Sequence, residues 1–315
     1  MADVAYIPGA HGRERRPLLG YAMVTAAALL FAANGTVSKV VLSSGLSALE
    51  LTQVRASGAF LGFALALALV NRPSLRVRPR ELAYLAVFGV AGVAMVQWLY
   101  FVSIHRLPIG IALLIEYLAP ILIALWAWAV MKQRVRRRIW VALGLALAGL
   151  SLVVEFWSGV TLDGLGIAAA FAAAVAYAVY VLMAEHAVGT REPASVLCYG
   201  FLFAAVFWAV VQPAWRFPFE RVDDSVSLLG RLEAFRAPVW LLLLFVVVVG
   251  TMVTFLLVTA ALRHISATRV AIIAMLEPVA AGLVAFAWLG ESFGPLQLLG
   301  GGIVLAGIVL AQTAR

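Results

Sequence analysis

The sequence has little charge and only one cysteine. Of its 315 residues, 12% are Asp, Glu, Lys or Arg, whereas 64% are hydrophobic. A soluble domain of this length does not need so large an apolar share, so we expect an integral membrane protein. The single cysteine, Cys198, excludes an internal disulfide. The net charge of +8 comes without a basic tract interleaved with aromatic residues, so nucleic acid is not an expected partner.

Several catalytic and cofactor patterns are also missing. The sequence has no Walker A phosphate loop, which excludes the ATP-hydrolysing subunit of an ATP-driven pump. It also has no H-E-x-x-H zinc motif. Its aspartates all lie outside the apolar stretches, which excludes an intramembrane aspartyl protease: Asp3, Asp163, Asp223 and Asp224. The histidines lie at termini or ends of apolar stretches without ligand spacing: His11, His105, His186 and His264. We therefore predict no enzyme activity, no cofactor and no metal site.

Ten apolar stretches are each long enough to cross a bilayer, whose hydrocarbon core of about 30 Å needs about 20 helical residues. They lie at about 18–43, 49–70, 81–102, 108–131, 138–157, 164–186, 193–212, 238–261, 267–289 and 294–313. Arginine and lysine are concentrated at 72–80 and 132–138, on one side of the alternating spans, as is typical of cytoplasmic loops. We therefore expect an all-α integral membrane protein with both termini in the cytoplasm.

The two halves of the chain repeat one another at a constant shift of 158 residues. One proline and three glycines coincide: Pro120 with Pro278, Gly92 with Gly250, Gly144 with Gly302 and Gly149 with Gly307. Five helices per half is an odd number, so the second half enters the membrane from the opposite side, and we expect inverted repeats, a signature of transporters. The first spans are more diverged. Gly20 aligns with Gly164 only if the segment after Trp208 contains an insertion.

These boundaries predict a cytoplasmic segment at 1–17, a first five-helix repeat at 18–157 and a second at 164–313. The second repeat contains one sizeable extracytoplasmic loop at about 213–237. Two interpretations of this loop stand. It is either a solvated connector or a short helix on the membrane surface. The helix would present one apolar face, formed by Leu228, Leu229, Leu232 and Phe235.

Two glutamates lie where hydrocarbon makes an ionisable group cost about 2.5–3.5 kcal/mol. Glu116 and Glu277 fall near mid-membrane in the fourth and ninth spans, about one helical turn apart in the register of the repeat, so both can face one cavity. Each is either a protonatable or substrate-binding group, or a carboxyl group that bonds a neighbouring helix. Pro120 and Pro278, in the same spans, are predicted structural hinges.

Other polar and aromatic side chains inside the spans complete the predicted site. A tyrosine at mid-membrane needs a hydrogen-bond partner, and tyrosines beside carboxylates suit a zwitterion or an aromatic ligand. Lys39 and Arg55 are expected to extend to the membrane surface instead. The predicted substrate-binding residues are Asn34, Gln97, Tyr100, Glu116, Tyr117, Tyr177, Tyr180 and Glu277.

Two stretches resemble a known transporter family. The stretch from Trp98 to Pro120 reads WLYFVSIHRLPIGIALLIEYLAP and is similar to the third and fourth helices of the drug/metabolite transporter superfamily. The stretch from Ala271 reads AIIAMLEPVAAGLVAFAWLGESFGPLQLLGGGIVLAGIVLA and resembles its C-terminal EamA signature, including a Glu-Pro pair. The first half departs from this pattern, because Ala119 precedes Pro120 where the family pattern has glutamate. Within the superfamily the chain is most similar to the YddG-type aromatic amino-acid exporters.

The resemblance implies a ten-helix inverted-repeat carrier of the bacterial inner membrane with its cavity between the halves. We predict a secondary transporter that exports small metabolites, above all amino acids with aromatic ones favoured, by alternating access. Its expected partners are the solute and the lipid bilayer, and the oligomeric state is left open. Two alternatives remain. One is a proton-coupled exporter of organic cations that uses Glu116 or Glu277, and the other is a non-transporting subunit or an enzyme acting on lipid-linked sugars.

Overall fold

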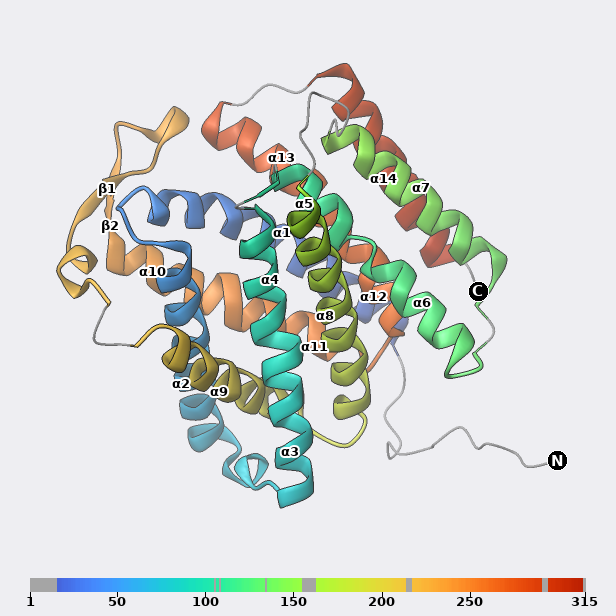
Figure 1. The fold of residues 1–315 in the computed structure, drawn as a ribbon, viewed down its shortest axis with the longest axis horizontal. Coiled ribbons are helices and arrows are strands. Elements are labelled where there is room, and N and C mark those ends of the chain that lie inside the picture. Colours follow the sequence, from blue (N-terminus) through green and yellow to red (C-terminus); the bar gives the residue numbers. More distant parts are fainter. Residues whose placement is uncertain are drawn as a thin grey trace.

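The computed structural model describes residues 16–104, 106–107, 109–133, 135–154, 163–213, 217–290 and 294–313. Within these residues, ten helical segments are long and apolar enough to cross a membrane, as the sequence predicts, and they pack into one bundle (Figure 1). Most of the predicted segment 1–17, the end of the fifth span at 155–157 and residues 214–216 of the loop lie outside the described residues.

The spans are either single helices or runs of shorter pieces. The single helices are α1 (Pro17–Leu42), α2 (Ala48–Val70), α7 (Arg137–Val154), α8 (Gly164–Val188), α9 (Pro193–Val211) and α14 (Pro295–Thr313). The third and eighth spans contain a π-helical turn: α3 (Pro79–Val87), η2 (Phe88–Ala94) and α4 (Met95–Ile104), then α10 (Val239–Val247), η6 (Val248–Val253) and α11 (Thr254–Ala261). The fourth and ninth spans are broken: α5 (Ile109–Glu116) and α6 (Ala119–Ala129), then α12 (Ala267–Ala274), α13 (Leu276–Val284) and the π-helical η7 (Ala285–Leu289).

Local sequence signals explain where several helices begin. Ser47 and Glu50 form a capping box at the start of α2, in which the Glu50 N–H donates to Ser47 Oγ at 3.2 Å and the Ser47 N–H donates to Glu50 Oε2 at 2.6 Å. Asp163 caps α8, because its Oδ1 accepts the Gly166 N–H at 2.7 Å. Prolines begin α1, α3 and α9, where a missing N–H breaks no helical bond.

The fourth and ninth spans are each interrupted four residues before a proline. α5 ends at Glu116 before Pro120, and α12 ends at Ala274 before Pro278. A proline ring clashes with the carbonyl four residues earlier and has no N–H to donate to it, so the first helix ends there. The next helix begins with the proline in its first turn. The breaks fall at equivalent positions of the two halves, and hinge motion at them stays a prediction.

Helices of the first half pack against helices of the second half in a repeated pattern. α2 packs against α9, α6 against α12, and α7 against α14, and Figure 1 shows α7 and α14 side by side. Each of these pairs joins corresponding spans of the two halves. In addition, α1 packs against η6 and α11, while α8 packs against η2 and α4. The pattern of contacts is therefore unchanged when the two halves are exchanged.

Close approaches at glycines follow the same exchange and correct the alignment of the first spans. A Cβ atom at Gly20 would lie 3.0 Å from His264 Cβ, and one at Gly166 would lie 2.9 Å from Arg106 Cβ. Arg106 and His264 are equivalent at the shift of 158 residues. Gly20 therefore corresponds to Gly166, two residues beyond the Gly164 that the sequence comparison suggested.

The loop between α9 and α10 contains a packed β-hairpin. Its elements are η4 (Phe219–Val222), β1 (Ser225–Ser227), η5 (Gly230–Leu232) and β2 (Arg236–Pro238), and β1 pairs with β2 in antiparallel fashion. Leu228 and Leu229 pack against a buried cluster at the ends of α1, α2 and α10, and Trp288 Nε1 donates to the Leu228 carbonyl at 2.8 Å. Phe235 is exposed. The interpretation as one surface helix is wrong, because the described part of the loop forms this hairpin. Residues 217–238 are exposed or half-buried, as expected of a solvated connector, although Leu228 and Leu229 also cover the bundle.

Candidate functional site

The two helix breaks bring polar side chains of the two halves into contact. Tyr117 lies in the break between α5 and α6, and its hydroxyl donates a hydrogen bond of 3.2 Å to Oε2 of Glu277 in the first turn of α13. Glu116 is the last residue of α5 and interacts electrostatically with Glu277. The breaks therefore place two carboxyl groups and a phenol where the fourth and ninth spans meet.

Two further tyrosines approach this pair of glutamates. Tyr100 on α4 and Tyr177 on α8 each interact electrostatically with both Glu116 and Glu277. Tyr117 also interacts with Tyr177. Five of the eight predicted site residues therefore lie together, contributed by the third, fourth, sixth and ninth spans. We call Tyr100, Glu116, Tyr117, Tyr177 and Glu277 the carboxylate cluster.

Arg55 on α2 belongs to this region, and the sequence interpretation missed it. The expected position at the membrane surface is wrong: Nε of Arg55 donates at 3.1 Å to Oγ1 of Thr251 in η6, and its charge interacts with Glu277. Thr251 is fully buried, so the guanidinium extends into the bundle. The position of Arg55 in the span could have indicated this inward direction, because Arg55 lies about two turns from the start of α2.

Asn34 packs against the same π-helical turn that holds Arg55. It is only 5% exposed on α1 and packs against Gly250 of η6, where a Cβ atom would lie 1.8 Å from Asn34 Oδ1. Only glycine permits this approach. The next residue, Thr251, holds Arg55, so the π-helical turn receives both side chains. Oδ1 of Asn34 has no hydrogen-bond partner among the described residues.

Gln97 presents a second amide oxygen of this kind. It precedes Tyr100 by three residues on α4, so the two side chains share one side of the helix. Its Oε1 is buried, and no described residue donates a hydrogen bond to it. A buried acceptor left unpaired costs about 1–3 kcal/mol, and such groups in a folded protein call for an explanation such as a bound polar molecule.

Tyr180 has the surroundings of a core side chain. It shares a face of α8 with Tyr177, as predicted, and the two ring centroids are 6.1 Å apart. It is only 4% exposed, stacks on Phe88 at 5.5 Å and shares a hydrogen bond of 3.3 Å with Thr259 Oγ1. The polar and aromatic contacts of Tyr180 are thus already made by the protein.

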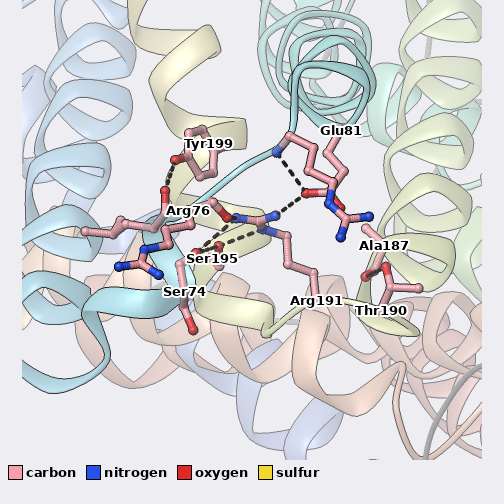
Figure 2. Close-up of polar contacts among 10 residues, drawn as sticks. Ser74, Arg76, Glu81, Ala187, Thr190, Arg191, Ser195 and Tyr199 are labelled. Carbon is pink, nitrogen blue, oxygen red and sulfur yellow. Dashed lines mark hydrogen bonds and ion pairs between the residues drawn. The ribbon is translucent and has the colours of Figure 1, made fainter.

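A different arginine, Arg191 in the turn between α8 and α9, is held by several bonds at one end of the bundle (Figure 2). Its guanidinium donates to two side chains and two backbone carbonyls: Ser195 Oγ at 2.8 Å, Glu81 Oε2 at 2.7 Å, Ser74 O at 3.0 Å and Arg76 O at 2.6 Å. The Tyr199 ring lies 5.4 Å from its Cζ. These contacts, which the sequence analysis did not foresee, fasten η1 (Arg72–Leu75) and the start of α3 to α9.

The region around Glu277 offers binding chemistry of two signs. Glu116 and Glu277 can receive a cation, Arg55 can receive an anion, and the phenol rings can stack on a ligand or hydrogen bond to it. Among the described residues, no three side chains of His, Cys, Asp or Glu come together as a metal site. These side chains therefore offer contacts to charges of either sign and to aromatic groups.

The chain is similar to known transporters over most of its length. It is 29% identical to an uncharacterized transporter of Archaeoglobus fulgidus, over 93% of this chain and 96% of the relative. It is 26% identical to the threonine/homoserine exporter RhtA of Escherichia coli K12, over 78% of this chain and 76% of the relative. A solved crystal structure has the same fold with a TM-score of 0.75 at 16% identity, covering 93% of this chain and 96% of that chain.

The EamA-like transporter family matches residues 18–155 and 164–313. These ranges include all ten spans except Pro17, the first residue of the first span. This agrees with the drug/metabolite transporter resemblance. The relatives are transporters and not enzymes, so a small-molecule substrate and a lipid environment follow for this multi-pass membrane protein. The chain belongs to the EamA-like transporter family.

Proposed function

We propose that this chain is a secondary transporter that exports amino acids, with aromatic ones favoured, across the bacterial inner membrane. The observation that carries the proposal is the hydrogen bond from Tyr117 to Glu277, which joins the broken helices of the two halves amid further tyrosines. Carboxylates suit the ammonium group of an amino acid, and phenol rings suit an aromatic side chain. The similarity to a threonine/homoserine exporter supports the amino-acid class.

The proposed transport cycle is alternating access between two inverted repeats, at 18–157 and 164–313. The exchange of contacts between the halves supports this organisation, and the arginine-rich loops support cytoplasmic termini. Relative motion of the halves about Pro120 and Pro278 would separate Tyr117 from Glu277. The site would then open toward one side of the membrane or the other.

The proposed lining is the full predicted set, in unequal roles. The carboxylate cluster would contact the solute directly. Asn34 and Gln97 would contribute their amide oxygens, to which no described residue donates. Tyr180 would support Tyr177 from behind, because its own hydroxyl and ring are engaged.

The test is counterflow of labelled phenylalanine, tryptophan and threonine into liposomes that contain the purified protein. We expect saturable uptake that excess unlabelled amino acid suppresses. Tyr100→Ala and Tyr117→Ala should lower the rate without lowering membrane insertion. Absence of flux for all three amino acids, with folded protein confirmed, would contradict the proposal, and normal rates in both variants would contradict the site.

A second candidate, a proton-coupled exporter of organic cations, is favoured by the proximity of Glu116 and Glu277. Intramembrane carboxyl groups serve as proton relays in transporters. Under this alternative, tetraphenylphosphonium flux would follow an imposed pH gradient, and Glu116→Gln or Glu277→Gln would abolish that dependence. Tetraphenylphosphonium flux that ignores the gradient would exclude it.

A further inference from the structure

We propose that Arg55 binds the carboxylate of the transported solute, while Glu277 and Tyr117 receive its ammonium group, so that the site selects amino acids over simple amines. This inference rests on the proposed amino-acid export and adds the residue that recognises the carboxylate. Three observations support it: the unfilled donors of Arg55, the orientation imposed by Thr251, and the opposite charge of Glu277.

Arg55 uses only a fraction of its hydrogen-bonding capacity. A guanidinium carries five N–H donors, four of them on its two Nη atoms. In the described part of the chain, Arg55 makes one hydrogen bond, from Nε to Thr251 Oγ1 at 3.1 Å, and its Nη atoms have no acceptor there. An arginine inside a membrane bundle usually pairs with a carboxylate or with carbonyls, because an unpaired cation is costly in apolar surroundings. The Nη atoms are therefore the open part of a binding site.

Thr251 determines which edge of the guanidinium is open. Its hydroxyl donates to the Val246 carbonyl at 2.8 Å, so its oxygen remains free to accept from Nε of Arg55. With Nε occupied, the two Nη atoms form the available edge. Their parallel N–H bonds match the two oxygens of a carboxylate, a geometry that lysine does not offer.

Glu277 supplies the opposite charge without pairing directly with Arg55. The two charges interact, yet Arg55 forms no direct ion pair with a carboxylate among the described residues. Oε2 of Glu277 accepts from Tyr117, and Oε1 accepts from no described residue. An amino acid carries its ammonium and carboxylate on one carbon, so a single molecule can bridge the two. A simple amine would satisfy Glu277 and leave Arg55 unpaired.

The experiment compares three ligands that differ by one group each: phenylalanine, phenethylamine, which lacks the carboxylate, and 3-phenylpropionate, which lacks the ammonium. Each competes with labelled phenylalanine in counterflow by wild-type protein, Arg55→Gln and Arg55→Lys in liposomes. The matched control is Arg138→Gln, which removes an exposed arginine at the start of α7. Thermal stabilisation of the purified proteins by each ligand provides a readout that does not require transport.

We expect wild-type protein and Arg138→Gln to prefer phenylalanine over phenethylamine by about 10- to 100-fold, the contribution of one or two charge-assisted hydrogen bonds. In Arg55→Gln this preference should disappear, together with stabilisation by 3-phenylpropionate, and Arg55→Lys should keep only part of it. Wild-type transport of phenylalanine with unchanged discrimination in Arg55→Gln would overturn the role of Arg55 and leave amino-acid export standing. Failure of all amino acids to move through the wild-type protein, with no stabilisation by 3-phenylpropionate, would overturn both.

Discussion

Arg191 and Arg55 carry the same guanidinium group but make very different use of it. Arg191 donates to a carboxylate, a hydroxyl and two carbonyls, and a tyrosine ring lies beside it. Arg55 donates to one threonine hydroxyl, although it lies inside a membrane-spanning bundle. The first arginine is held by the protein from several sides. The second is anchored at one edge by the residues that the structure describes.

The difference separates a structural role from a binding role. A side chain most of whose donors are engaged has little left for a ligand, and its removal exposes several unpaired groups at once. A charged group with unused donors is destabilised by desolvation in the ligand-free protein. A bound ligand of opposite charge offsets that cost. We therefore expect substitutions at the Arg191 contacts to lower stability, and substitutions around Arg55 and Glu277 to lower transport.

Glu277→Gln should produce the largest change, and the change should be in transport. Glutamine still accepts a hydrogen bond from Tyr117, but the negative pole that faces Arg55 and a substrate ammonium is lost. A charge-assisted bond contributes about 1.5–3 kcal/mol, so counterflow of phenylalanine at low concentration should fall by about 10- to 100-fold. The melting temperature in detergent should stay near the wild-type value. A large fall in melting temperature with normal counterflow would show that Glu277 has a structural role and not a binding role.

Arg191→Gln should have the opposite effect and lower stability rather than transport. Its side chain is 14% exposed, but its partner Glu81 is 47% exposed, so part of the lost interaction is screened by solvent. We expect a loss of about 2 kcal/mol in stability and a melting temperature lower by about 5 °C. Counterflow per folded molecule should be nearly unchanged. If this variant transported at a tenth of the wild-type rate while melting normally, the Arg191 contacts would have to take part in the transport cycle.

Arg191→Lys should have about half this effect. Lysine keeps the charge opposite Glu81, but it cannot also reach the Ser74 and Arg76 carbonyls with the planar fork of arginine. A loss of about 1 kcal/mol is expected, measured by the same thermal unfolding. Equal melting temperatures for the lysine and glutamine variants would show that charge contributes nothing and that only the fork geometry matters.

Tyr180→Phe should have the smallest effect. It removes one shared hydrogen bond of 3.3 Å to Thr259 and leaves the stacking on Phe88 in place. Stability should change by about 0.5–1 kcal/mol and counterflow by less than about threefold. Tyr117→Phe is the matched comparison, because its hydroxyl bonds Glu277. A transport loss in Tyr180→Phe as large as that in Tyr117→Phe would place Tyr180 in the lining itself.

The site residues differ in how well the sequence could predict their surroundings. Glu116 and Glu277 were foreseeable because a carboxyl group in the middle of an apolar run needs a reason to be there. Their shared location was also foreseeable, because the repeat aligns Pro120 with Pro278. Tyr180 was chosen for its mid-membrane position and its spacing from Tyr177, and neither could reveal that Thr259 and Phe88 already satisfy it. Arg55 was misjudged because an arginine near a span end can extend either outward or inward.

The sequence by itself determined the ten spans, the duplication and the two helix breaks. Apolar run length is set by bilayer thickness, and a proline ends a helix by steric exclusion, so both effects are local. Only the tertiary structure decided the direction of Arg55, the packed hairpin after α9 and the bonds around Arg191. Each of these depends on groups distant in the chain: Thr251 for Arg55, the ends of α1, α2 and α10 for the hairpin, and η1 for Arg191. A polar side chain is positioned by whichever partners the packed helices bring near it, and no local pattern records them.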